Sequence, residues 1–113
     1  MAKYMILFSS SISASDQMAN STPEQVQASM ADWMKWHEEA NKTCKVEWGL
    51  PLQAVSRISN DGISESDNHA SGYATIEGDK DAIVEMLKSH PHLHLPEASI
   101  DLLEMIHMPG MDS

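Results

Sequence analysis

The chain has 113 residues, of which 42% are hydrophobic, and this predicts one folded domain spanning residues 1–113. It carries 17 acidic residues against 7 basic ones, a formal charge of −10. A surface this negative repels phosphate groups, so we exclude nucleic acid and anionic membranes as expected partners.

The N-terminal segment predicts a buried strand. Residues 3–8 read KYMILF, a short run in which both alternating sets of side chains are apolar. This run is too short for a signal peptide or for a membrane span, which needs about 20 apolar residues. The single cysteine, Cys44, excludes an intrachain disulfide and favours a reducing compartment. We therefore expect a cytoplasmic protein. Residues 9–21 are small and polar and predict a long loop.

Residues 23–43 predict an amphipathic helix. Thr22 is a good N-cap, Pro23 suits the first helical position, and Gln25 completes a capping box. Mostly apolar side chains then recur every three or four residues along one face. They are Val26, Met30, Trp33, His37, Ala40 and Cys44. A thiol on this stripe is expected to be buried and inert.

The middle of the chain predicts two strands joined by a polar connection. Residues 46–58 are strand-like, with a glycine and a proline that predict a bend or bulge. The sequence Asn-Asp-Gly at 60–62 predicts a turn. Residues 63–71 are polar and predict a loop, whereas residues 72–77 alternate and predict a strand.

The C-terminal third predicts a second helix and a last strand. Asp79 is the expected N-cap of a helix over residues 80–89, which Pro91 ends. Residues 90–98 predict an ordered loop, and residues 99–107 predict the last strand.

The order of these elements is β-α-β-β-α-β, which predicts an α+β domain of ferredoxin-like plan. In that plan two helices cover one face of a four-stranded antiparallel sheet. The first strand is apolar on both faces, so the uncovered face also needs a cover. The sheet of a second copy is the natural cover, and we expect a homodimer.

Three segments of the chain resemble the YCII-related family, a branch of the dimeric α/β-barrel superfamily. They are KYMILF at 3–8, GYATIEGD at 72–79 and HPHLHLPEASIDLLEMIHMPGM at 90–111. The resemblance implies homodimers with back-to-back sheets and a cleft between helices and sheet. Some members carry a histidine near the start of the first helix, whereas this chain has TPEQVQASM there.

Candidate catalytic residues come from the first helix and from the polar loop. His37 lies on the apolar stripe and is expected to point at the sheet. A buried imidazole has a lowered pKa and can accept a proton near neutral pH. Asp67 is the candidate partner that orients it, and a plain core histidine is the alternative.

Further residues are candidate ligand contacts. Trp33 and Trp48 could stack on a ligand or pack in the core or dimer interface. His69 lies in the polar loop, and His90 and His92 belong to an H-P-H-L-H run. In an extended chain this run places three imidazoles on one side, where they could bind a transition metal.

Three functions stay open at this point. One is a cofactor-free enzyme that uses His37 for acid–base chemistry on a small organic molecule. Another is a non-catalytic ligand-binding or accessory homodimer, and a third is metal binding through the histidine run. We expect no cofactor, because the chain has no phosphate loop or dinucleotide fingerprint.

Overall fold

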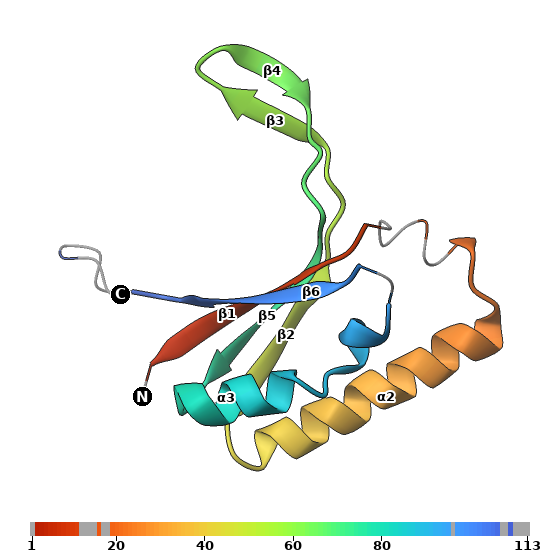
Figure 1. The fold of residues 1–113 in the computed structure, drawn as a ribbon, viewed down its shortest axis with the longest axis vertical. Helices are drawn as coiled ribbons and strands as arrows, with labels where there is room; N and C mark the ends of the chain where they lie inside the picture. Colours follow the sequence, from red (N-terminus) through yellow and green to blue (C-terminus); the bar gives the residue numbers. More distant parts are fainter. Residues whose placement is uncertain (1, 12–15, 17–18, 96, 107–108, 110–113) are drawn as a thin grey trace.

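The computed structural model describes residues 2–11, 16, 19–95, 97–106 and 109. Within these residues, strands and helices alternate as the sequence predicts, with one additional hairpin (Figure 1). In chain order the elements are β1 (Lys3–Ser9), α2 (Pro23–Asn41), β2 (Lys45–Pro51), β3 (Ser56–Ser59), β4 (Gly62–Glu65), β5 (Ala70–Glu77), α3 (Lys80–Leu87), the 3₁₀ helix η1 (Pro91–His94) and β6 (Ser99–Glu104).

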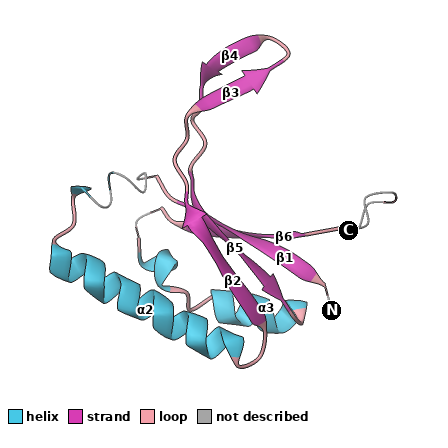
Figure 2. Cartoon of the chain, turned by 180° about the vertical axis from the view of Figure 1, so that it is seen from behind, coloured by secondary structure: helices cyan, strands magenta, loops and turns pink. Residues whose placement is uncertain are grey.

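Four of the strands form one antiparallel sheet in the order β2-β5-β1-β6. Helices α2 and α3 both lie on one side of this sheet (Figures 1 and 2). The predicted α+β class, with a four-stranded antiparallel sheet and two helices, is therefore confirmed. The strand order is compatible with the ferredoxin-like plan.

The core lies between the sheet and the helices. Tyr4, Ile6 and Phe8 on β1 are buried, and their partners on β5 include the buried Ala74 and Ile76. These side chains share one face because side chains alternate along a strand. Helices α2 and α3 add Ala40, Ile83 and Leu87 to the same cluster.

Helix α2 begins at the predicted residue. Gln25 N–H donates to Thr22 Oγ1 over 3.2 Å, and Thr22 N–H donates to Gln25 Oε1 over 2.9 Å, so the capping box is complete. The helix ends at Asn41, two residues before the predicted end. Asn41 Oδ1 accepts from Val46 N–H over 2.9 Å and thereby ties the helix end to β2.

Cys44 is buried in the connection between α2 and β2. Burial raises the pKa of its thiol, and the nearby negative charge of Asp79 raises it further. A thiol that stays protonated is a poor nucleophile, which agrees with the inert role that we predicted.

The polar connection before β5 differs from its prediction. Its first residues form strand β4, which pairs with β3 around the predicted turn at residues 60–62. Ala70 and Ser71, also predicted as loop, belong to β5. We call residues 52–69 the arm, and this hairpin forms its outer part. It projects from the sheet on the side opposite to the helices (Figures 1 and 2).

The C-terminal elements follow the prediction with shorter bounds. Asp79 caps α3 by accepting from Ala82 N–H over 3.1 Å, and the helix ends two residues early, at Leu87. Strand β6 ends at Glu104, and His107 lies outside the described residues. No helix in the described part of the chain is long and apolar enough to cross a membrane.

Candidate functional site

The H-P-H-L-H run is wound into a 3₁₀ helix, so the prediction of an extended chain is wrong. His90 is the N-cap of this helix, and its Nδ1 accepts from His92 N–H over 3.0 Å. Pro91 favours this turn because its φ is fixed near the helical value. His90 and His92 are buried and His94 is exposed, so the three imidazoles do not share one side.

The ring of His92 holds the end of the first strand. Its Nε2 lies 2.8 Å from the carbonyl oxygen of Ser9. A carbonyl can only accept, so Nε2 carries the proton and donates it in this bond. The β1–β5 register shifts between Phe8 and Ser9. Such irregularities change the direction of side chains at the rims of sheets, and here the bond from His92 holds the shifted strand end in place.

The ring of His90 fills the space between α2 and the sheet. Its centroid lies 4.5 Å from that of Trp33, 4.5 Å from that of Trp36 and 4.9 Å from that of Phe8. Burial, together with the smaller effect of positive charge on His92 and His94, lowers the pKa of His90 to about 3. His90 is therefore a neutral member of an aromatic cluster.

His37 lies on α2, half-buried, with its ring edge-on to Trp48 at a centroid distance of 4.9 Å. Trp48 also meets Trp33 edge-on at 5.9 Å. The Nδ1 atom of His37 is buried and has no hydrogen-bond partner among the described residues. A buried polar atom without a partner calls for an explanation, and a small bound molecule is one.

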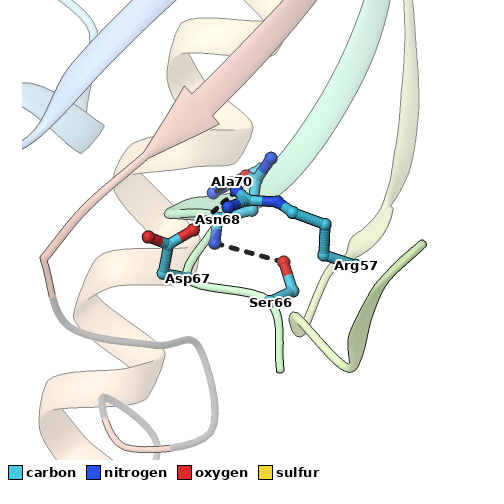
Figure 3. Close-up of polar contacts among 5 residues, drawn as sticks. All are labelled: Arg57, Ser66, Asp67, Asn68 and Ala70. Atoms are coloured by element: carbon cyan, nitrogen blue, oxygen red, sulfur yellow. Dashed lines mark hydrogen bonds and ion pairs between the residues drawn. The ribbon is translucent and has the colours of Figure 1, made fainter. Parts of the chain in front are cut away.

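Asp67, the predicted partner of His37, lies in the arm. Its Oδ1 accepts from Arg57 Nη2 over 2.6 Å, which ties the two sides of the arm together (Figure 3). Asn68 N–H donates to Ser66 Oγ over 3.2 Å, and Asn68 Oδ1 accepts from Ala70 N–H over 2.8 Å. These short local bonds set the backbone that leads into β5.

His69 stands between this turn and the end of β1. Its side chain is exposed, and its carbonyl oxygen accepts from Ser10 N–H over 3.0 Å. Close by, Ser71 Oγ donates to the carbonyl oxygen of Phe8 over 3.3 Å. The backbone around His69 is therefore bonded to the strand end that His92 also holds.

Two adjoining depressions meet at this place, with volumes of about 270 Å³ and 300 Å³. Both are lined by Ser10, Ser11 and His69, and we call their union the serine–His69 depression. The first adds Ser9, Glu97 and Ser99. The second adds Asp16, Leu52, Gln53, Ala54, Asp67, Asn68 and Ala70.

Most residues that line the depression have polar side chains, and some of them carry carboxylates. Serine hydroxyls both donate and accept hydrogen bonds, and an imidazole can do either. Glu97 has a φ of 55°, in the left-handed region that is uncommon for a residue other than glycine. Such conformations recur at functional sites. The arrangement suits a neutral or cationic polar molecule and repels anions.

Of the predicted ligand contacts, the depression contains His69, and it also contains the predicted catalytic Asp67. Trp33, Trp48, His90 and His92 lie in the aromatic cluster or beside it. The serines and Glu97 were not predicted. The run of serines directly after a buried strand was a usable signal, because such residues stand at the edge of the sheet.

No group of three or more His, Cys, Asp or Glu residues in the described part of the chain is placed to hold a metal ion. In the histidine run, His90 Nδ1 and His92 Nε2 already take part in hydrogen bonds. The geometry therefore gives the metal-binding hypothesis no ligand set in these residues.

Comparison of the chain with models of known protein families and with curated proteins found no match. The likeness to the YCII-related family accordingly stays a prediction from three sequence segments.

Proposed function

We propose that this chain is a homodimeric domain that binds a small polar molecule in the serine–His69 depression. The observation that carries the proposal is that two depressions meet at Ser10, Ser11 and His69. Ligand sites are concave surfaces in which a few polar groups converge on the bound molecule.

The size and charge of the depression limit the ligand. Volumes of about 270 and 300 Å³ lie just below and at the lower limit for sites of drug-sized ligands, so the ligand is small. The carboxylates of Asp16 and Glu97 in the lining, together with the chain's charge of −10, disfavour anions, whereas Arg57 balances the charge of Asp67. Amino alcohols and polyols match the hydroxyl groups, the imidazole and the negative charge.

The rim of the depression is held by hydrogen bonds to buried elements. His92 donates to the carbonyl of Ser9, and Ser10 N–H donates to the carbonyl of His69. Both His92 and Ser10 are buried. Supporting bonds of this kind keep a binding site in its productive shape before the ligand arrives.

The homodimer in the proposal rests on the sheet face that the helices leave open. By strand register, Met5, Leu7, Tyr73 and Leu103 point to this face. Its charged residues are two lysines and three carboxylates, so the face is close to neutral on a strongly acidic chain. These are Lys3, Lys45, Glu47, Glu77 and Asp101. A second copy covering this face would give the back-to-back barrel of the YCII-related family.

The binding test is a titration of ¹⁵N-labelled protein with ethanolamine, inositol and acetate. We expect ethanolamine or inositol to shift the amide signals of Ser9 to Ser11 and residues 68–70, and acetate to leave them unchanged. His69→Gln should weaken binding by about tenfold through a lost hydrogen bond to the ligand. The matched control is His94→Gln, an exposed histidine outside the depression. No shift with any probe, or equal losses in both variants, contradicts the proposal.

The dimer is tested separately by sedimentation equilibrium at micromolar concentration. Wild-type protein should have twice the 12.5 kDa mass of the chain. Leu7→Asp on the open face should dissociate it, because a carboxylate would be buried without a partner. Val84→Asp on the exposed side of α3 should leave the mass unchanged.

A second candidate function is acid–base catalysis by His37, and the buried Nδ1 without a partner favours it. A catalytic base must lie within about 3 Å of the proton that it takes, or reach it through one water. The imidazole ¹⁵N signals of His37 should then shift when a probe binds, and His37→Asn should bind that probe more weakly than the wild type. Unchanged signals with every probe would remove His37 from the site.

A further inference from the structure

The arm carries apolar side chains on its surface. Ile58 and Ile63 lie opposite each other on β3 and β4, and they are 76% and 78% exposed. Val55, at the base of the hairpin, is 78% exposed. A hairpin of two strands is marginally stable in water unless another element covers it. Strands β3 and β4 form a sheet of their own, apart from the four-stranded one.

The direction of the arm indicates what covers it. The arm leaves the sheet on the side opposite to α2 and α3, which is the side of the open face (Figures 1 and 2). A second copy that covers the open face therefore lies alongside the arm. The open face carries two lysines against three carboxylates and is close to neutral, so the acidic Asp61 and Glu65 of the hairpin meet no strong repulsion there.

The base of the arm is also a wall of the ligand site. Residues 52–54 from one side of the arm and residues 67–69 from the other line the second depression. Arg57 and Asp67 join these two sides through their ion pair (Figure 3). A contact that fixes the hairpin therefore also fixes this wall, since both belong to the same pair of chain segments.

We infer that the arm clasps the second copy of the homodimer, and that this clasp holds the wall of the serine–His69 depression in place. The inference rests on the proposed function, to which it adds a partner surface and a mode of regulation. Because coupling between two binding events is reciprocal, a ligand in the depression strengthens the dimer by the factor by which the dimer strengthens ligand binding.

The clasp is tested with Ile58→Asp and Ile63→Asp, which change exposed residues and should leave the fold intact. We expect the dimer dissociation constant, measured by sedimentation equilibrium, to rise by about tenfold or more, as for the loss of an apolar anchor at an interface. Ethanolamine or inositol, whichever binds the wild type, should bind these variants more weakly. Val84→Asp is the matched control and should leave both quantities unchanged.

The outcomes separate the clasp from the proposed function. A wild-type mass of 12.5 kDa would overturn both the dimer and the clasp. A dimer that Leu7→Asp dissociates but Ile63→Asp does not would overturn the clasp and leave the proposed function standing. Unchanged probe affinity in a dissociated Ile63→Asp variant would overturn the coupling.

A mixed dimer locates the arm directly. A nitroxide is attached at Asp61→Cys in an unlabelled chain that also carries Cys44→Ala, and this chain is mixed with ¹⁵N-labelled wild type. We expect the nitroxide to broaden a local group of amide signals on the open-face side of the ¹⁵N-labelled copy. Uniform broadening of all its signals, or no broadening, would show that the arm does not reach the second copy.

Discussion

The helix-covered face of the sheet and the arm contain the same apolar residue types in opposite surroundings. Ile6, Ile76 and Ile83 are fully buried between sheet and helices, whereas Ile58 and Ile63 on the arm are about three-quarters exposed. Burial of an isoleucine side chain stabilises a fold by about 1.5–3 kcal/mol, so only the first set stabilises the isolated chain. The second set is available for association.

The histidines divide in the same way. His90 and His92 lie inside, where they cap the 3₁₀ helix and hold the end of β1. His69 lies outside, in the depression where the arm meets the sheet. The two buried histidines hold the strand end beside the depression, and the exposed one is accessible to a ligand. In this chain, an imidazole's role follows from its burial and its partner.

The largest expected effect on stability comes from comparing the same change, isoleucine to alanine, in the core and in the arm. Ile76→Ala should lower the free energy of unfolding by about 2–5 kcal/mol, because it leaves a cavity in the core. Ile63→Ala should change it by less than about 0.5 kcal/mol at concentrations where the chain is monomeric, since the residue is exposed. Urea unfolding measures both, and equal losses would erase the contrast between the two regions.

Local sequence signals located most elements correctly because their causes are local. The capping box of Thr22 and Gln25 set the start of α2, and Asp79 set the start of α3. Polar strand β4 was missed because it has no alternating pattern to distinguish it from a loop, and its stability comes from pairing with β3. Both helices end two residues before the predicted end for a similar reason, because the contacts of the following segments determine where each helix stops.

The site was predicted less well because it depends on contacts between distant residues. The bond from His92 to Ser9 joins positions 83 residues apart, and no spacing rule reveals it. The winding of the histidine run into a 3₁₀ helix likewise depends on the burial of His90 between α2 and the sheet. His69 and Asp67 were singled out by residue type, whereas the serines were overlooked, because their position after a buried strand gains meaning only where the strand end and the arm come together.

The next effect concerns acid stability and the buried His90. Its pKa is lowered from 6.5 to about 3, so between these values the unfolded chain binds a proton that the folded chain does not. Stability conferred by the neutral ring is therefore complete above pH 6.5 and falls as the pH drops toward 3. We expect a loss of up to about 5 kcal/mol from this group across that range, because each pKa unit corresponds to about 1.4 kcal/mol.

The matching variant is His90→Asn, whose side-chain oxygen can accept from the backbone N–H of residue 92 and does not titrate. It should be less stable at neutral pH and should flatten the acid slope of the unfolding free energy. His94→Asn, at the exposed end of the same run, should keep most of the wild-type slope, because its charge is the smallest of the causes that lower the pKa of His90. An unchanged slope in His90→Asn would mean that another group causes the acid sensitivity.

The smallest effect on stability is expected at the ion pair of the arm, and it separates stability from function most sharply. Arg57 and Asp67 are both well exposed, and such pairs contribute about 0–1 kcal/mol. Arg57→Gln should therefore leave the urea midpoint almost unchanged, as should Lys88→Gln, which breaks an exposed pair at the end of α3 with the same change of charge.

Probe binding should distinguish the two variants. Arg57→Gln releases Asp67, which lines the depression, and loosens the two sides of the arm, so its affinity for the bound amino alcohol or polyol should change. Lys88→Gln should match the wild type in titrations followed by amide shifts. If both variants bind as the wild type does, the ion pair is only a surface contact, and the wall of the depression is held without it, by bonds such as those between backbone N–H groups and side-chain oxygens in residues 66–70.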